Sequence, residues 1–308
     1  GERARRRVAG RSSRRASRWR PSLHYSYADV QSYLRYGVVM ALSGMSLRLY
    51  QTLDRLVIGR FFGEAQLGLY QNANTLSSMP LDKIWPLLQQ ILFPLFSRLR
   101  EDKQHCNEIY LQALKHYLLL VSPIYLGSAI VANDLVLVIL GEKWLFMTPI
   151  FTMFCSVKLF QVLTAYHVTL DNTTGRHKSA MIFNFASALL IPGLMWLGSY
   201  HSFTGGLAPW VSAYPILCIS WLFWSLRKSD ISIKRYISTI AQGMFASIIM
   251  SAALIPLKLS ALLESFTPAM RLSIEIGIGI MAFITITLIF QRSMLISSIN
   301  LLRKKQIV

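Results

Sequence analysis

The sequence predicts an all-α fold, a polytopic membrane helix bundle of about eight transmembrane helices with both termini cytoplasmic. Three observations predict it: the composition, the length of the apolar runs and the distribution of basic residues. The 308 residues are 53% hydrophobic and only 15% charged, whereas a typical soluble domain is about 25% charged. A soluble domain of this length cannot cover so many apolar side chains, and a disordered chain requires low hydrophobicity.

Long apolar runs alternate with short polar breaks from Tyr36 onward. A transmembrane helix needs roughly 20 mainly apolar residues, whereas barrel strands are about ten residues long and alternate strictly. The first two runs are the weakest, because charged residues interrupt them. The expected spans are 36–58, 68–96, 113–140, 146–170, 179–199, 206–226, 236–257 and 269–291.

The segments before, between and after these spans differ in basic residues, which predicts orientation. If the segments lie alternately on the two sides of the membrane, 24 of the 32 Lys and Arg lie on the same side as the N-terminus and 4 lie on the opposite side. The other 4 lie within the expected spans. Lys and Arg accumulate in cytoplasmic loops. The net charge of +18 is therefore explained mainly by membrane topology, and the alternation predicts an even number of spans. The segment of Asp171, Asn172 and Gly175 is expected to form a plain cytoplasmic turn.

Residues 1–24 are predicted to be a basic, disordered cytoplasmic tail or linker, followed by a membrane domain over 25–308. Nine of the first twenty residues are Arg, with no apolar period. Such a tail binds anionic lipid headgroups or contacts phosphates of a substrate. Nucleic acid is not expected as a partner, because Trp19 is the one aromatic residue before position 25.

The residue pattern contains no enzyme signature, cofactor motif or metal-ligand spacing. Nucleotide-binding glycine motifs, nucleophile elbows and zinc motifs are missing, and the six His are scattered along the chain. The three cysteines form no C-x-x-C pair and no disulfide framework. We therefore expect no enzyme, no cofactor and no metal.

One stretch carries a recognisable motif pattern. Residues 53–103 read LDRLVIGRFFGEAQLGLYQNANTLSSMPLDKIWPLLQQILFPLFSRLREDK, and residues 130–144 read IVANDLVLVILGEKW. This pattern resembles the oligosaccharide flippase family, which exports lipid-linked O-antigen, colanic acid and teichuronic acid units, within the multidrug/oligosaccharidyl-lipid/polysaccharide exporter superfamily. The matching positions are Asp54, Gly59, Arg60, Phe61, Gly63, Gly68, Tyr70, Pro80, Phe93, Pro94, Ser97, Arg98, Leu99, Gly141 and Trp144.

The resemblance implies a location in the chain of a larger transporter. Family members usually have two pseudo-repeated lobes, and this motif block normally opens the second lobe. The chain then corresponds to the C-terminal lobe, with the linker at 19–26 and with the N-terminal lobe absent. We expect a fragment or truncated gene that needs the missing lobe or another membrane subunit.

The implied function is translocation of a lipid-linked oligosaccharide or polysaccharide repeat unit across the bacterial cytoplasmic (inner) membrane by alternating access. The implied substrate is an undecaprenyl-pyrophosphate-linked oligosaccharide, with membrane lipids as further partners. Two alternatives remain: a non-transporting half-flippase remnant, and a drug or cation antiporter of the same superfamily.

Charged residues within the spans are the candidate sites, because such residues usually face a wet cavity or a partner. Arg48 and Arg55 are seven residues apart with Gln51 between them, so the three share one helix face. Arg offers planar donors for phosphate. The predicted pyrophosphate-binding set adds two lysines from other spans. It is Arg48, Gln51, Arg55, Lys83 and Lys158.

Asp54 and Asp82 are the candidates for coupling transport to an ion gradient, because protonation or sodium binding would switch their pairing. Asp82 is expected to pair with Arg48 or Arg55. Prolines 80 and 86 on either side of it predict a bend whose freed carbonyls face a cavity. The competing structural explanation is that these charges form ion pairs between helices, or that they extend to the membrane interface.

Overall fold

The computed structural model describes residues 27–99, 101–260, 263 and 265–290, and all regular elements within them are helical. The expected tail at 1–24, the linker at 19–26 and the last residues from 291 lie outside this part. The chain divides into two compact units, residues 1–38 and 39–308. The second unit contains all the helices discussed below, from residue 39 of α2 onward.

Helix α2 (Tyr27–Leu99) contains the first two expected spans as two arms that meet at Gly63. Gly63 has φ +77° and ψ −177°, a conformation that only glycine adopts without strain. The turn between the two arms is therefore located at Gly63. Pro80, Pro86 and Pro94 lie inside the second arm, and Gly63 is the one position with non-helical dihedral angles.

The middle of the chain forms α3 (Lys103–Ile130), α4 (Ala132–Leu140), the 3₁₀ helix η1 (Glu142–Met147) and α5 (Thr148–Thr173). Asp102 caps α3, because its carboxylate accepts a hydrogen bond of 3.0 Å from the backbone N–H of His105. Gly141, with φ +89°, ends α4. Gly175, with φ +82°, lies in the turn after α5, where such a conformation is typical of a helix end.

The C-terminal half continues with α6 (His177–Ser199), α7 (Phe203–Val211), α8 (Ala213–Lys228), α9 (Ile233–Leu259) and α10 (Pro268–Phe290). Ser202 caps α7 by accepting a hydrogen bond from the backbone N–H of Gly205. The short α7 is followed directly by α8. The two elements together form one expected span.

Six of the expected spans correspond to helices that are long and apolar enough to cross a membrane, within the part of the chain that the structure describes. These are Lys103–Ile130, Glu142–Thr173, His177–Ser199, Phe203–Lys228, Ile233–Leu259 and Pro268–Phe290. The two arms of α2 are not among them, and five charged residues within the first two expected spans lower their hydropathy. The all-α multi-pass fold is confirmed, and the orientation of its termini remains a prediction.

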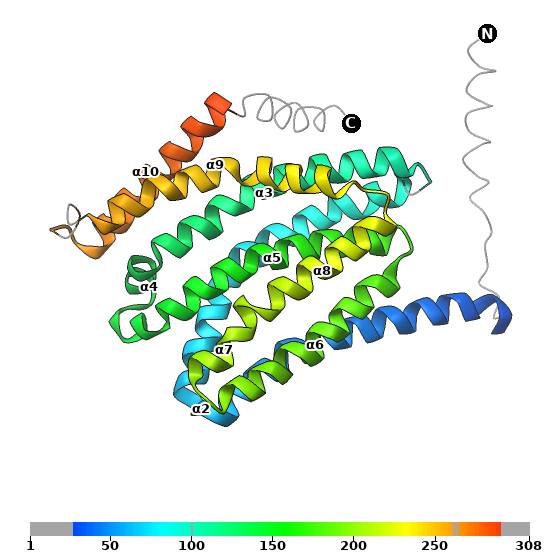
Figure 1. Cartoon of the computed structure of the whole chain (residues 1–308), viewed down its shortest axis with the longest axis horizontal. Coiled ribbons are helices and arrows are strands. Elements are labelled where there is room, and N and C mark those ends of the chain that lie inside the picture. The colour runs from blue at the N-terminus through cyan, green and yellow to red at the C-terminus, as the bar shows by residue number, and fades with distance from the viewer. Residues whose placement is uncertain (1–26, 100, 261–262, 264, 291–308) are drawn as a thin grey trace, which may run out of the picture. The chain divides into compact units, whose positions relative to one another are not determined.

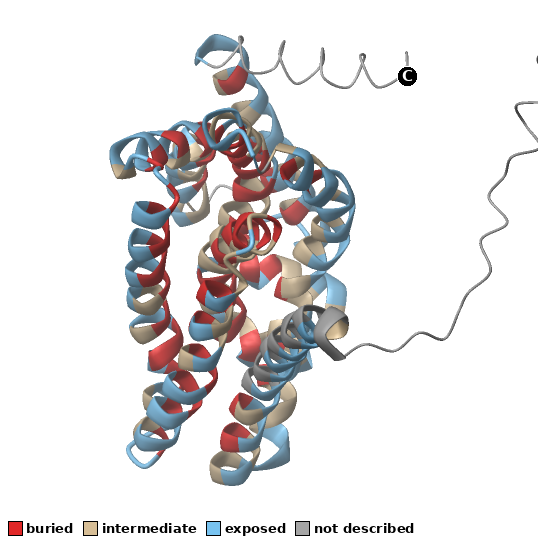
Figure 2. Cartoon of the chain, turned by 90° about the vertical axis from the view of Figure 1, so that its right-hand side faces the viewer, coloured by how far each residue is buried: buried red, intermediate tan, exposed pale blue. Residues whose placement is uncertain are grey.

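The helices pack through their inward faces, as the burial colours in Figure 2 show. α3 lies beside α9 and α5, whereas α6 contacts α5, α7 and α8. The contact between α3 and α9 is close: a Cβ at Gly243 would lie 2.8 Å from Leu118 Cβ. The hydroxyls of Ser122 and Ser247 are hydrogen-bonded across the same contact at 2.7 Å. Small residues that allow such close approach are typical of helix contacts in membranes.

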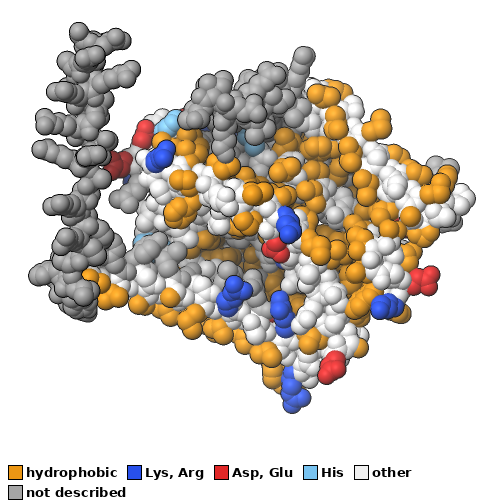
Figure 3. All heavy atoms as spheres, turned by 180° about the vertical axis from the view of Figure 1, so that it is seen from behind, with side chains coloured by type: hydrophobic (Ala, Val, Ile, Leu, Met, Phe, Trp, Pro, Cys, Tyr) orange, Lys and Arg blue, Asp and Glu red, His pale blue; other side chains and the backbone are white. Residues whose placement is uncertain are grey.

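Large apolar side chains are exposed along most of the helices, for example Leu189 and Leu197 on α6 and Met281 on α10. Figure 3 shows apolar side chains spread over one face, with few charged ones among them. An exposed apolar surface of this extent is unfavourable in water and favourable in a bilayer. The exposed surface therefore agrees with the membrane assignment from composition.

Candidate functional site

A cavity of about 420 Å³ opens between α2, α5, α6 and α8. Each of these helices contributes polar side chains to its wall. This is unusual for the interior of membrane-spanning helices, where polar residues mark binding sites and pathways. The lining residues are Leu81, Asp82, Trp85, Pro86, Gln89, Gln161, Thr164, Ala165, Val168, Phe183, Asn184, Ser187 and Tyr214.

Aromatic packing fixes one wall of this cavity. The Trp85 ring lies 5.6 Å from the Tyr117 ring and 6.3 Å from the Tyr166 ring, measured between centroids. On α6, Phe183, which also lines the cavity, stacks on Trp221 at 4.5 Å with an interplanar angle of 29°. Aromatic contacts of this geometry hold both rings in place. The cavity therefore has a preformed shape.

Lys158 lies behind the cavity wall. It is buried, and its Nζ donates hydrogen bonds of 3.0 Å to Asn74 Oδ1 and of 3.0 Å to Gln161 Oε1. The same ammonium lies 5.8 Å from the centroid of the Phe154 ring. The competing explanation from sequence is an ion pair with a carboxylate of another helix; the structure instead gives this lysine amide oxygens. Lys158 thus contacts the cavity through Gln161.

Asp54 is buried at the junction of the two arms of α2. Its Oδ2 accepts a hydrogen bond of 2.7 Å from the Tyr70 hydroxyl, and its Oδ1 accepts one of 2.7 Å from the backbone N–H of Arg55. The Tyr70 hydroxyl in turn accepts a hydrogen bond of 3.0 Å from Trp210 Nε1 on α7. This network connects the two arms across Gly63 and joins them to α7.

The remaining predicted site residues lie on the exposed side of α2. Arg48, Arg55, Asp82 and Lys83 are all exposed, and Asp82 lines the cavity. Among these described side chains, the expected ion pair of Asp82 with Arg48 or Arg55 is not formed, since Asp82 faces the cavity instead. The side chain of Gln51 lies outside the described part of the structure.

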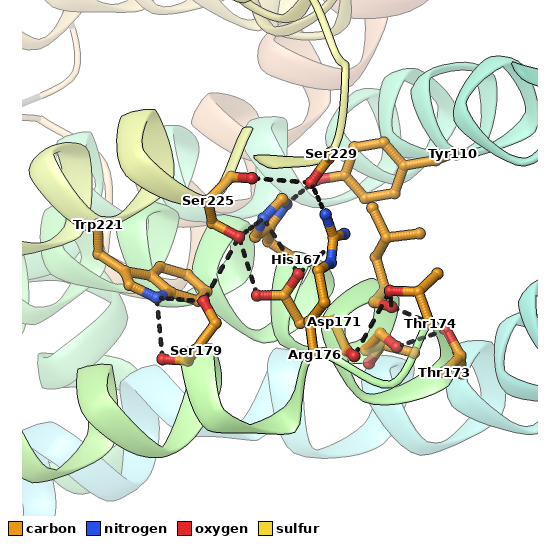
Figure 4. Close-up of polar contacts among 12 residues, drawn as sticks. Tyr110, His167, Asp171, Thr173, Thr174, Arg176, Ser179, Trp221, Ser225 and Ser229 are labelled. Atoms are coloured by element: carbon orange, nitrogen blue, oxygen red, sulfur yellow. Dashed lines mark hydrogen bonds and ion pairs between the residues drawn. The ribbon is translucent and has the colours of Figure 1, made fainter. Parts of the chain in front are cut away.

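A second polar cluster lies inside the bundle and is not predicted from the sequence. Hydrogen bonds join Tyr110 on α3, His167 and Asp171 on α5, and Ser225 on α8 (Figure 4). His167 Nδ1 lies 2.9 Å from the Tyr110 hydroxyl, and His167 Nε2 lies 2.8 Å from Ser225 Oγ. Ser225 donates a hydrogen bond of 2.9 Å to Asp171 Oδ2. These contacts tie three helices together in the core.

Arg176 extends this cluster to the next turn. Its Nη2 lies 3.0 Å from Asp171 Oδ1, and its Nη1 donates a hydrogen bond to Ser229 Oγ. The expected turn around Gly175 is present, but the expectation of a plain turn is wrong for Asp171, which is fully buried. Its ionised form is compensated by Arg176, as burial of a charge requires.

A third cluster joins α4, α9 and α10. Lys258 forms ion pairs with Asp134 and, at 3.0 Å, with Glu275. Arg271 pairs with Asp134 Oδ1 at 2.7 Å. Both carboxylates are buried. This network of two cations and two anions fixes the last two described helices to α4.

Comparison with known proteins agrees with the motif pattern. Residues 13–149 match the model of the family described as polysaccharide biosynthesis protein. The chain is 24% identical over 273 residues to the teichuronic acid biosynthesis protein TuaB of Bacillus subtilis, covering 87% of this chain and 56% of that protein. It is 28% identical over 178 residues to the lipopolysaccharide biosynthesis protein WzxC of Escherichia coli, covering 58% of this chain and 36% of that protein.

Residues 13–149 of the chain are thus similar to the polysaccharide biosynthesis family. The resemblance inferred from the motif is thereby confirmed, since the matched region contains that motif from Asp54 to Trp144. Its relatives belong to a flippase and transporter family rather than to an enzyme family. The chain spans about half or less of the length of these curated relatives. No solved structure matches it.

Proposed function

We propose that this chain takes part in moving a lipid-linked oligosaccharide across the bacterial cytoplasmic membrane by alternating access. The observation that carries the proposal is the polar cavity between α2, α5, α6 and α8, in a chain whose residues 13–149 match the polysaccharide biosynthesis family. A saccharide has hydroxyls on every edge and cannot enter hydrocarbon without partners for them. A cavity lined by amides, hydroxyls and a carboxylate supplies such partners within the membrane-spanning bundle.

The proposed substrate is an undecaprenyl-pyrophosphate-linked saccharide. Its pyrophosphate would bind to the exposed cations of α2, Arg48, Arg55 and Lys83, because guanidinium groups form paired, charge-assisted hydrogen bonds with phosphate oxygens. The lipid chain would remain in the bilayer beside the exposed apolar surfaces. Since the chain covers only part of its relatives, the remaining walls of the pathway would come from another polypeptide segment.

Ion coupling is assigned to Asp54 and Asp82 in this proposal. Asp54 accepts two hydrogen bonds at the junction of the α2 arms, so a change in its protonation would alter the contact between the arms. Asp82 is exposed to the cavity, so its charge would respond directly to substrate entry. In this proposal, protonation of either carboxylate would be linked to a change of conformation.

A specific observation also favours one other function. The single carboxylate and the aromatic rings in the cavity are features that bind lipophilic cations. A drug or cation antiporter is therefore the second candidate. It predicts that substrate entry depends on Asp82 rather than on the basic residues of α2.

Deletion of the coding sequence in the bacterium that carries it tests both candidates. The measurement is the amount of lipid-linked saccharide on each membrane leaflet, detected by a lectin in spheroplasts before and after permeabilisation. The proposal expects saccharide to accumulate on the cytoplasmic leaflet and expects the full chain to reverse this. Antiport instead expects higher cellular uptake of a lipophilic cation with unchanged polysaccharide, and a remnant without transport changes neither quantity.

A further inference from the structure

We propose that the cavity between α2, α5, α6 and α8 is a subsite for an uncharged sugar ring, and that it excludes the pyrophosphate. The inference rests on the proposed function and divides the substrate between two places on this chain. The sugar next to the lipid enters the cavity, whereas the pyrophosphate stays on the exposed cations of α2.

The charge of the wall excludes a phosphate group. Among the described residues that line the cavity, Asp82 is the single charged side chain. A pyrophosphate there would face a carboxylate and no cation, although phosphate sites in proteins are built from Arg, Lys and backbone N–H groups. The other helices that line the cavity, α5, α6 and α8, belong to segments long and apolar enough to cross a membrane, where an unpaired anion is strongly unfavourable.

Lys158 does not change this conclusion. Its Nζ is 3.0 Å from both Asn74 Oδ1 and Gln161 Oε1, and the side chain is buried. An ammonium group only donates hydrogen bonds, so it holds the amide oxygen of Gln161 toward Lys158. We therefore reassign Lys158 from a phosphate contact to a positioning residue that orients Gln161 in the cavity wall.

The polar groups of the wall match the edges of a sugar ring. Asp82 and Gln89 come from α2, Gln161 from α5, Asn184 from α6 and Tyr214 from α8. Carboxylate and amide groups each offer two polar atoms, so one group binds two neighbouring hydroxyls. Because the groups approach from four helices, they surround a ligand whose hydroxyls point outward in several directions.

Ser187 provides an independent indication of an absent partner. It is 3% exposed, it lines the cavity, and within the described structure its Oγ has no hydrogen-bond partner. Buried hydroxyls are nearly always hydrogen-bonded in native proteins. A ligand hydroxyl in the cavity would satisfy this group as donor or acceptor, whereas an apolar ligand would leave it without a partner.

Pro86 adds an acceptor on the α2 side of the cavity. Proline has no backbone N–H, so the helical partner of the Asp82 carbonyl, four residues earlier, is missing. Both residues line the cavity. Trp85 between them presents an aromatic ring held by Tyr117 and Tyr166, and the C–H face of a sugar packs on such a ring. The volume of about 420 Å³ is within the usual range for small-molecule sites, about 300–1,000 Å³.

Photocrosslinking to the full chain in nanodiscs tests the proposal. The probe is undecaprenyl-pyrophosphoryl-N-acetylglucosamine with a diazirine on its acetyl group; the second probe is undecaprenyl pyrophosphate with a diazirine on the first isoprene unit. Mass spectrometry locates the crosslinks. We expect the sugar diazirine to label residues 161–168 and 183–187, and we expect the second probe to label the exposed side of α2.

The variant Asn184→Leu should lower labelling by the sugar probe by at least about fivefold, as expected for loss of a ligand hydrogen bond. Ser187→Ala is the milder second variant and should also lower labelling by the sugar probe. It replaces Asn184→Leu as the test if that variant does not fold. The control is Asn133→Leu, an exposed position on α4 outside the cavity, and it should label like the parent chain.

Three outcomes would overturn the subsite. Labelling of the cavity by the sugar-free probe would place the pyrophosphate there. Complete competition by tetraphenylphosphonium, without competition by free N-acetylglucosamine, would assign the cavity to a cation. Sugar labelling outside the cavity together with saccharide accumulation on deletion would reject the subsite while leaving the proposed function intact; failure of that function is recognised separately by unchanged saccharide on deletion.

Discussion

Ser225 on α8 donates a hydrogen bond of 2.9 Å to Asp171 on α5, and this proton determines the direction of the neighbouring hydrogen bonds. The hydroxyl has one hydrogen, so it accepts from His167 Nε2, which lies 2.8 Å away. His167 Nδ1 then accepts from the Tyr110 hydroxyl at 2.9 Å. The chain of donors therefore runs from Tyr110 through His167 and Ser225 to Asp171, with Arg176 completing the compensation of its charge.

Replacement of Asp171 should destabilise the bundle. The variant Asp171→Leu leaves Arg176 and Ser225 without their shared acceptor, and breaking a buried ion pair in this way costs about 3–5 kcal/mol. The measurement is thermal unfolding of the purified chain in detergent. Asp230→Asn is the control: Asp230 is exposed with φ +58°, and Asn tolerates this left-handed conformation. Equal stability of the two variants would contradict a structural role for the cluster.

The variant Tyr70→Phe tests the junction of the α2 arms. It removes the hydroxyl that donates to Asp54 and accepts from Trp210, so two buried polar groups lose a partner. The expected loss of stability is about 1–3 kcal/mol, measured by the same unfolding assay. Tyr200→Phe, at an exposed position on the surface, should change stability much less. An unchanged melting temperature for Tyr70→Phe would show that this network does not hold the arms.

The break in α2 is predicted to depend on glycine at one position only. A Cβ at Gly63 meets no atom within 4 Å, so the effect of Gly63→Ala comes from backbone strain at φ +77°, about 1–3 kcal/mol. Gly68→Ala is the matched control, since its Cβ also meets nothing within 4 Å and its φ is not positive. Comparable melting temperatures for the two variants would mean that the arms do not require this conformation.

The sequence predicts the helical class well because membrane insertion leaves a strong signal in single segments. The last five expected spans agree with observed helices, and α10 (Pro268–Phe290) matches the expected 269–291 to within one residue. The expected span 113–140 is displaced: α3 runs from Lys103 to Ile130, and the end of the expected span falls on the separate helix α4. The sequence predicts two separate spans at 36–58 and 68–96, and the structure has two helical arms that meet between them, at Gly63. Local sequence identifies such a glycine but does not select it from its neighbours.

The polar clusters are not predictable in the same way, because they depend on residues far apart in the chain. His167 and Asp171 are four residues apart and share a helix face, which is a detectable signal. Ser225 and Tyr110 join them only through packing of three helices. Asp82 is a candidate because of its charge alone, but its position in the cavity follows from the approach of α5 and α6.

Arg48 provides the most direct test of the pyrophosphate site on α2. The side chain is exposed, so Arg48→Ala should not impair folding or membrane insertion. Loss of a charge-assisted hydrogen bond to phosphate should lower export of the lipid-linked saccharide by about tenfold or more. The measurement is leaflet-resolved lectin binding in deletion cells that express each variant, normalised to the amount of chain in the membrane.

The conservative replacement distinguishes charge from geometry at this position. Arg48→Lys keeps the charge but loses the planar pair of donors, so it should restore export only in part. Arg60→Ala is the control for loss of an exposed cation from the same helix, and it should export normally because Arg60 is not in the proposed site. Normal export by Arg48→Ala would remove Arg48 from that site, because a cation that holds the pyrophosphate cannot be lost without effect on export.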